Sequence, residues 1–306
     1  MITFLRKRFL FIVTIFFIGS GITSLTTAEP AKQTSIQEKL AELEASSGGR
    51  IGVSATDTAN NTRIQYRAKE RFPIGCTSKV IGVSAILKMS MTDSQLLQQK
   101  ITYKKEEITP WSPITEKHVS DGMTVAELCD AAITISDNTA MNLLLKKLGG
   151  LSALNTFARV SLGDQSFRMD HDWPEEAKSG GSDNVFDSST PAAMEKSLRQ
   201  LALGDVLAPP QREQLIDWLK NNKTGDARIR ASVPKGWVVG DKTGTGSYYG
   251  TTNDIAIIWP PKSAPIVIAL YYTHNKKDAA KRDDILASVT RLLIDEFARR
   301  DQRIKL

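Results

Sequence analysis

The first part of the chain carries two kinds of hydrophobic pattern in succession. Residues 35–45 repeat apolar positions at helical spacing, and Ser35 stands where an N-cap is expected. Residues 51–57 and 62–67 alternate between apolar and polar positions, with a turn signal at residues 60–61 between them. The sequence therefore predicts an amphipathic helix followed by a β-hairpin.

The middle of the chain has a helical pattern, and strand patterns return toward its end. Helical spacing dominates from residue 77 to about residue 203. Strand patterns return at 236–242, 254–259 and 266–272, and a helical pattern closes the chain at 278–300. The strands at the two ends have to pair to complete one sheet, which predicts an α/β part with an all-α part inserted into it. The cleft between these parts is the expected ligand site.

These patterns also suggest domain boundaries. We predict an α/β domain made of residues 29–68 and 216–306, and an all-α domain made of residues 69–215. The sequence contains no internal repeat and no low-complexity linker.

The N-terminal residues have the pattern of an export signal. A basic cluster, Arg6-Lys7-Arg8, precedes an apolar run at 9–18, and small residues follow up to Ala28. The apolar run is short for a membrane span, and no cysteine near Ala28 offers a site for a lipid anchor. The sequence therefore predicts a signal peptide at 1–28 and an exported protein, periplasmic or secreted, without a stable membrane anchor.

The composition of the chain limits the kinds of molecule that it is expected to bind. The chain has 40 basic and 34 acidic residues, and because the predicted signal carries three basic residues and no acidic one, the mature charge is about +3. Basic and acidic residues are mixed, without the basic stripe and interleaved aromatic residues typical of nucleic-acid binding. The three histidines stand apart from one another and lack metal-ligand spacing. We predict a small anionic substrate, no nucleic acid, no metal and no cofactor, and nothing indicates more than a monomer.

The strongest candidate for chemistry is Cys76. It precedes the helical pattern of residues 77–91, with Lys79 one turn further along. A helix N-terminus and a neighbouring ammonium both favour a thiolate, which is the nucleophilic form. Ser78 is a poorer candidate, because adjacent helical residues point to different faces. A disulfide between Cys76 and Cys129 is the alternative for an exported protein.

Three further stretches carry polar groups at the ends of predicted elements. Ser136-Asp137-Asn138 ends a helical pattern and is also compatible with an ordinary turn. Lys242-Thr243-Gly244 follows a strand pattern and is also compatible with a strand edge leading into a hairpin turn. The glycines after it fit a dinucleotide-binding loop poorly, and no βα unit follows. Arg228-Ile229-Arg230 precedes that strand and is also compatible with a solvated face.

Taken in chain order, these stretches form a recognisable series. Cys-x-x-Lys at 76–79, Ser-Asp-Asn and Lys-Thr-Gly correspond to the SxxK, SDN and KTG motifs. With this series, the chain resembles the class A serine β-lactamases along nearly all of the mature sequence. Further matching text lies at residues 71–73, 112–113, 115–118, 121–125, 190–194 and 239–246. The resemblance implies an antiparallel five-stranded sheet flanked by N- and C-terminal helices, an inserted all-α domain and an active site in the cleft between them.

The resemblance also implies a role for each motif residue. Cys76 takes the acyl-accepting position and Lys79 the proton-shuttling one. The backbone amides of Cys76 and Thr245 form an oxyanion hole, and Ser136 relays a proton to the leaving nitrogen. Residues implied in substrate binding are Asn138, Lys242, Thr243, Gly244, Thr245, Arg228 and, as an aromatic residue at the mouth of the cleft, Trp111.

Two departures from the family concern catalysis. Cys76 stands where family members have serine. In addition, the family carries Arg-Trp-Glu-x-x-x-Asn in the loop that activates water, whereas residues 170–178 here read DHDWPEEAK. An alignment on Trp173 puts Pro174 at the glutamate position, whereas an alignment without gaps from residues 167–170 puts Trp173 there. A small shift brings in Glu175, which we favour as the general base, or Glu176, and the expected asparagine has no clear counterpart.

Other departures concern what holds the site together. His171 or Asp172 replaces the basic residue that normally pairs with Asp187 and pins this loop. The disulfide of carbapenem-hydrolysing relatives is absent, since the corresponding positions are Gly75 and Gly246. The family partner of Cys129 is also missing, which predicts a free buried thiol there.

The sequence thus predicts an exported hydrolase that opens the β-lactam amide of penicillins and cephalosporins through an acyl-enzyme on Cys76, with a role in antibiotic resistance. A β-lactam-binding protein that traps the acyl group is the first alternative, motivated by the altered loop. A D-Ala-D-Ala carboxypeptidase is the second, since the same motifs serve both families. The substrate spectrum does not follow from these motifs.

Overall fold

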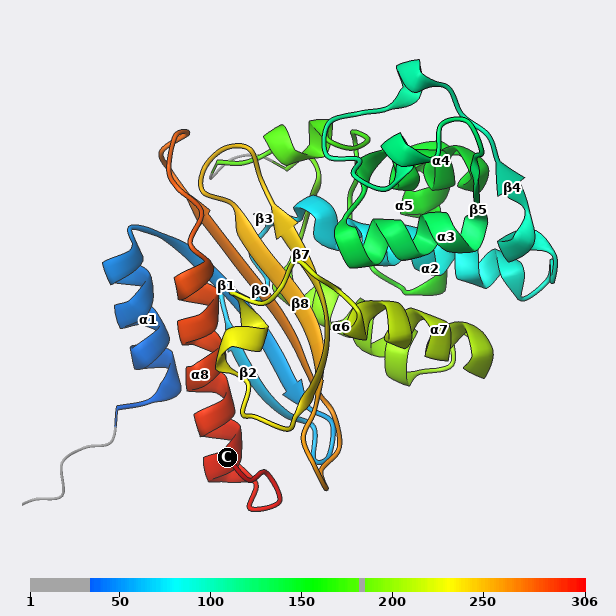
Figure 1. The fold of residues 1–306 in the computed structure, drawn as a ribbon. Coiled ribbons are helices and arrows are strands. Elements are labelled where there is room, and N and C mark those ends of the chain that lie inside the picture. The colour runs from blue at the N-terminus through cyan, green and yellow to red at the C-terminus, as the bar shows by residue number, and fades with distance from the viewer. Residues whose placement is uncertain (1–33, 182–184) are drawn as a thin grey trace, which may run out of the picture. The chain divides into compact units, whose positions relative to one another are not determined.

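Five strands from the two ends of the chain form one antiparallel sheet (Figure 1). The computed structural model describes residues 34–181 and 185–306, so the predicted signal peptide at 1–28 lies outside the described residues. The strands are β1 (Gly49–Asp57), β2 (Thr62–Tyr66), β7 (Val238–Thr245), β8 (Thr252–Trp259) and β9 (Ile266–His274), in the order β2-β1-β9-β8-β7. The predicted hairpin and three C-terminal strands are therefore confirmed, and β7 is an edge strand.

Two terminal helices, α1 (Ile36–Ser47) and α8 (Asp283–Arg300), lie together along this sheet (Figure 1). Ser35 caps α1 as predicted: its Oγ accepts from Glu38 N at 3.2 Å, and the Glu38 carboxylate accepts from Ser35 N at 2.7 Å. Apolar side chains of both helices, such as Leu40 and Phe297, form one core with sheet residues. The closing helix begins at Asp283 rather than at residue 278, because the preceding residues turn back and Lys277 O accepts from Tyr249 N.

The middle of the chain is mostly helical, as predicted. Its helices are α2 (Lys79–Ser90), α3 (Val125–Asp130), α4 (Asn138–Leu148), α5 (Gly150–Ser161), α6 (Pro191–Leu203) and α7 (Pro209–Lys220). Two short strand pairs lie among them, β3 (Phe72–Pro73) with β6 (Ser188–Ser189) and β4 (Lys100–Ile101) with β5 (Met123–Thr124).

A second core joins these helices to the sheet. It contains helix residues such as Val80 and Leu144 together with Ile257 and Tyr271 of the sheet. Alternate residues of β8 and β9 therefore contribute to different cores, since side chains of a strand point to opposite faces. Residues 35–306 group as one compact unit. The predicted division into an α/β domain (29–68 and 216–306) and an all-α domain (69–215) therefore stays a prediction. Within the part of the chain that is described, every helix is too short or too polar to cross a membrane.

Candidate active site

Cys76 lies on a short 3₁₀ turn, Gly75–Ser78, that leads directly into α2. This turn packs tightly against the edge strand β7. A Cβ atom at Gly244 would come within 2.7 Å of Ile74 O, and one at Gly75 would lie 3.5 Å from Thr245 N. Glycine at position 244 is thus required for the close approach that brings Cys76 beside Thr245.

Lys79, at the start of α2, is completely buried beneath this turn. Its Nζ donates to Asn138 Oδ1 at 2.6 Å and to Ser136 O at 2.7 Å, and it lies 3.4 Å from Ser136 Oγ. Ser136 has a left-handed backbone (φ 63°) directly after a π-helical turn, Ala131–Ile135. Such turns are frequent at functional sites, and this one aims the Ser136 side chain at the lysine.

Lys242 is a second lysine that contacts Ser136. The residue lies within β7, so Lys242, Thr243 and Gly244 belong to the strand itself instead of following it as the sequence suggested. Lys242 Nζ donates to Ser136 Oγ at 2.9 Å and is fully buried. Burial lowers the pKa of its ammonium to about 8. Ser136 Oγ is therefore held between two buried lysines, in a position to pass a proton.

The thiol of Cys76 is half-buried and faces a carboxylate. Its Sγ lies 3.6 Å from Glu176 Oε1. Burial by itself would raise the pKa of this thiol, but the charges of Lys79 and Lys242 and hydrogen bonds from neighbours outweigh it, so the net shift is downward. Burial raises the pKa of Glu176 well above its usual range, and the nearby Cys76 thiolate raises it further. The ionisation of the thiol and that of the carboxyl group are thus linked by their contact.

Of the two adjacent glutamates, the structure brings Glu176 to the thiol, and not Glu175, which the sequence analysis favoured. Glu175 is exposed and forms an ion pair with Lys178, at 2.6 Å, whereas Glu176 is 1% exposed and contacts Cys76. Both belong to the turn Glu175–Lys178, where adjacent side chains point in different directions. Glu176 Oε2 has no hydrogen-bond partner among the described residues, which is a costly state for a buried carboxylate.

Asp187 pins the loop that carries Glu176. Its Oδ1 accepts from the backbone of Asp170 and His171, and its Oδ2 receives Ser179 Oγ at 2.6 Å and contacts His171 Nδ1 at 2.7 Å. Of the two replacements considered for the family's basic residue, His171 is the one that makes the contact.

We predict that this contact makes the thermal stability of the protein pH-dependent. The hydrogen bond to Asp187 raises the pKa of His171 above its usual 6.5, so its stabilising contribution is complete below pH 6.5 and is lost as pH rises through the raised value. We expect the melting temperature to fall by on the order of 1–3 °C across this range. The His171→Arg variant should lack this fall in melting temperature, because arginine stays charged throughout the range. The control variant His118→Gln, which changes a different histidine, should show the same fall as the wild type. Scanning calorimetry from pH 5.5 to 8.5 measures this, and a fall that persists in His171→Arg would contradict the assignment.

Asn142 is a residue that the sequence analysis missed. On α4, its amide accepts from Trp173 N at 3.1 Å and donates to Trp173 O at 2.6 Å, which ties the loop to the helical core. Its position four residues after Asn138, on the same helix face, is the signal that could have identified it. Trp173 itself is 1% exposed, and the ammonium of Lys79 lies 5.8 Å from its ring centroid.

Among the substrate-binding candidates, Thr243, Thr245 and Asn138 lie around Ser136 and Cys76. Thr243 Oγ1 contacts Thr224 Oγ1 at 2.5 Å, and Thr245 is exposed at the end of β7. Asn138 donates to Pro110 O at 2.8 Å while it accepts from Lys79. Since β7 is an edge strand, Thr243 and Thr245 belong to a polar edge of the sheet.

The structure places Arg228 differently from the prediction. It is 4% exposed, and its guanidinium donates to Asp283, Gly244 O and Thr245 Oγ1, the last at 2.6 Å. Arg228 is therefore buried against β7 and orients Thr245.

Trp111 lies at the exposed edge of the helical half. It is 64% exposed, its Nε1 donates to Ile135 O at 3.1 Å, and its carbonyl accepts from Asn138 N at 3.0 Å. These bonds attach the tryptophan to the turn that carries Ser136.

Cys129 is free and completely buried, as predicted, and the disulfide with Cys76 is not formed. Burial raises the pKa of the Cys129 thiol strongly. Among the described residues, no cluster of metal-ligating side chains occurs.

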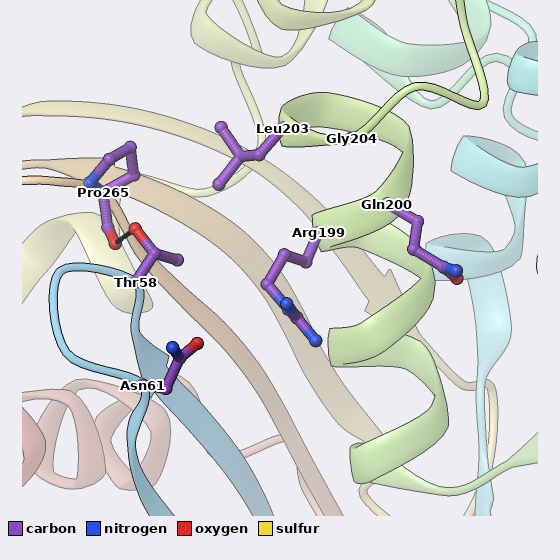
Figure 2. A pocket seen from close by; sticks show the side chains of 7 residues that line it. All are labelled: Thr58, Asn61, Arg199, Gln200, Leu203, Gly204 and Pro265. Atoms are coloured by element: carbon purple, nitrogen blue, oxygen red, sulfur yellow. Dashed lines mark hydrogen bonds between the residues drawn. The ribbon is translucent and has the colours of Figure 1, made fainter.

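A hollow elsewhere on the molecule is separate from these groups. Figure 2 shows Arg199 and Leu203 of α6 facing the β1–β2 connection, with Asn61 and Thr58, and Pro265 of the β8–β9 connection. None of the candidate residues lines it.

Comparison with known proteins gives consistent matches. The family model described as the Beta-lactamase enzyme family matches residues 35–297. A β-lactamase of Citrobacter koseri is 48% identical over 284 residues, which cover 93% of this chain and 95% of that protein. The β-lactamase Toho-1 of Escherichia coli is 49% identical over 267 residues, 87% of this chain and 91% of that protein. The solved structure of an ancestral (GNCA) class A β-lactamase has a TM-score of 0.82 and 53% identity, covering 86% of this chain and 100% of that one.

Proposed function

We propose that this chain, which belongs to the β-lactamase enzyme family and hydrolyses β-lactams, opens the lactam ring with the thiol of Cys76 and releases the product with Glu176. The observation that carries the proposal is the 3.6 Å contact between Cys76 Sγ and Glu176 Oε1 beside two buried lysines. In this arrangement, Cys76 is the nucleophile, and Glu176 is a base close enough to act on an acyl group bound to Cys76.

Acylation uses the groups around Ser136. The thiolate attacks the lactam carbonyl, and the backbone amides of Cys76 and Thr245 stabilise the resulting oxyanion. The lactam nitrogen then leaves with a proton from Ser136 Oγ, which is 2.9 Å from Lys242 Nζ and 3.4 Å from Lys79 Nζ. A lysine re-protonates the serine, and the product of this step is a thioester on Cys76.

Deacylation uses Glu176, and acylation prepares it for this role. The charge of the thiolate is one cause of the raised pKa of Glu176, and that charge disappears when the thioester forms. Lys79, which favours the ionised form, then has no opposing neighbour on Cys76. The proton of Glu176 passes to the lysine that gave up its own during acylation, so Glu176 is a carboxylate when a water molecule has to be deprotonated.

The proposed general base, Glu176, lies three residues after the position at which the family carries its glutamate. Trp173 takes the position of the family's glutamate in an alignment without gaps, and Glu176 follows three residues later, in the turn Glu175–Lys178. The bond from Glu176 N to Asp172 O, at 3.1 Å, folds that turn back toward Trp173. A glutamate at 176 thus reaches the nucleophile while Trp173 fills the space beneath Lys79.

Substrate binding follows from the edge strand. We assign the substrate carboxylate to Lys242, Thr243 and Thr245, with Arg228 holding Thr245 by a hydrogen bond, and the side-chain amide of the substrate to Asn138. Exposed Trp111 provides an apolar contact at the rim. No cofactor enters these steps.

Binding by Lys242 predicts a pH dependence. Burial lowers the pKa of Lys242 to about 8, so its charge is lost above that pH and the substrate carboxylate is held less firmly. We expect kcat/KM to fall about five- to tenfold between pH 8 and pH 9. Steady-state kinetics from pH 6 to 9.5 measures this. The Lys242→Arg variant should lack the fall, and an equal fall in both proteins would exclude Lys242 as its origin.

A non-turnover acyl trap is the second candidate function. The observation in its favour is the burial of Glu176, which opposes the ionised base. The test that separates the two is a time course of intact mass on the mature protein, reduced and mixed with excess penicillin. An adduct that forms and clears while penicillin is consumed supports hydrolysis, and one stoichiometric adduct that persists supports the trap. Absence of any adduct contradicts both.

Export and a role in resistance complete the proposal. They rest on the signal pattern at residues 1–28 and on the family membership. Expression of the whole chain in a susceptible bacterium should give a periplasmic or secreted protein whose N-terminus follows Ala28. It should also raise the penicillin concentration that the cells tolerate.

A further inference from the structure

Sulfur at position 76 changes which molecules can accept the acyl group. The inference rests on the proposed function, because it concerns the thioester that would form on Cys76. When an amine attacks that thioester, the tetrahedral intermediate holds two possible leaving groups, the amine and the sulfur. The group with the lower pKa leaves faster, as in thiol exchange.

The surroundings of Cys76 make its sulfur the better leaving group of the tetrahedral intermediate. A thiol has an ordinary pKa of about 8.5, far below that of a serine hydroxyl. The completely buried ammonium groups of Lys79 and Lys242 lower the pKa of Cys76 further. An oxygen ester at the same position would expel the amine and return to the starting acyl-enzyme, whereas the thioester proceeds to an amide.

Glu176 can take the proton that the amine loses. Its Oε1 lies 3.6 Å from Cys76 Sγ, and its Oε2 has no hydrogen-bond partner within the part of the chain that is described. A buried carboxylate oxygen without a donor is available for an N–H group that arrives next to the sulfur. The surrounding lysines select against a cationic acceptor, so the favoured one is a small, neutral primary amine.

We infer that this protein also transfers the acyl group of a β-lactam from Cys76 to primary amines and thereby forms amides. The amine nitrogen bonds to the thioester carbon, the carbon–sulfur bond breaks with its electron pair on Sγ, and one amine proton moves to Glu176. No oxidant, reductant or other reactant is required. The activity belongs to the cysteine at position 76 and would be suppressed by a serine there.

Glycinamide is a suitable probe because it is small and carries no carboxylate. The enzyme is incubated with penicillin and increasing glycinamide at pH 7.5, where Lys242 keeps its charge, and mass spectrometry measures both products, penicilloic acid and penicilloyl-glycinamide. The background is the Cys76→Ala variant, which corrects for direct attack of the amine on penicillin. The matched control is Cys76→Ser, which presents the same acyl group as an oxygen ester.

We expect an amide-to-acid ratio on the order of 10- to 100-fold higher for the wild type than for Cys76→Ser, because the pKa of the leaving thiol is several units below that of a serine hydroxyl and the group with the lower pKa leaves faster. The lifetime of the wild-type adduct should also shorten as glycinamide increases, and this measurement stands even where the serine variant fails to acylate. An adduct that forms but yields only acid, or equal ratios in the two proteins, overturns the inference alone. Absence of the adduct overturns the proposed function and the inference with it.

Discussion

Replacement of Glu176 by glutamine is expected to leave acylation of Cys76 intact and to stop release of the product. Glutamine has nearly the same shape as glutamate but accepts no proton, so water attacking the thioester is no longer activated. General-base catalysis of this kind contributes about 10²–10⁴-fold, and kcat should fall by that factor. Intact-mass measurements should show the penicilloyl adduct persisting in Glu176→Gln while it clears from the wild type.

Glu175→Gln is the matched control for this variant. Glu175 stands next in the chain and carries the same side chain, but it is 51% exposed and paired with Lys178. Its substitution should change kcat by less than about twofold, in line with the small energetic value of exposed ion pairs. If Glu175→Gln stalls as an adduct and Glu176→Gln turns over normally, the assignment of the base is wrong.

Replacement of Cys76 by alanine is expected to abolish both the adduct and the turnover. The proposed pathway is entirely covalent, so the oxyanion hole and the lysines remain but have no acyl group to act on. Removal of a nucleophile from such a constellation costs on the order of 10⁴–10⁶ in kcat. Loss of penicillin absorbance, followed together with intact mass, measures the effect.

Cys129→Ala is the control that separates the two thiols. Cys129 is completely buried away from the site, and its truncation should lower stability through the cavity that it leaves. Turnover per folded molecule should stay at the wild-type level. Undiminished turnover in Cys76→Ala would exclude the cysteine pathway and require another nucleophile in the same cleft.

The sequence by itself determined the elements and the motif positions. Strand alternation and helical spacing predicted the hairpin, α1 and the three C-terminal strands, because both patterns are local and follow from which side of an element is buried. The short motifs at Cys76, Ser136 and Lys242 were informative for a similar reason. Cys76 and Ser136 lie at the ends of helical segments, whereas Lys242 lies within β7, where the alternation of a strand already limits the direction of the side chain.

Only the tertiary structure decided which of several neighbouring groups does the chemistry. The loop with Glu175 and Glu176 has no periodicity, so the choice between the two carboxylates depended on contacts with Cys76 and Asp172 from outside their own turn. Arg228 is buried against β7, and His171 pairs with Asp187, 16 residues further along the chain. The burial and the charged neighbours of these side chains are provided by segments distant in sequence. They therefore exist only once those segments have folded together.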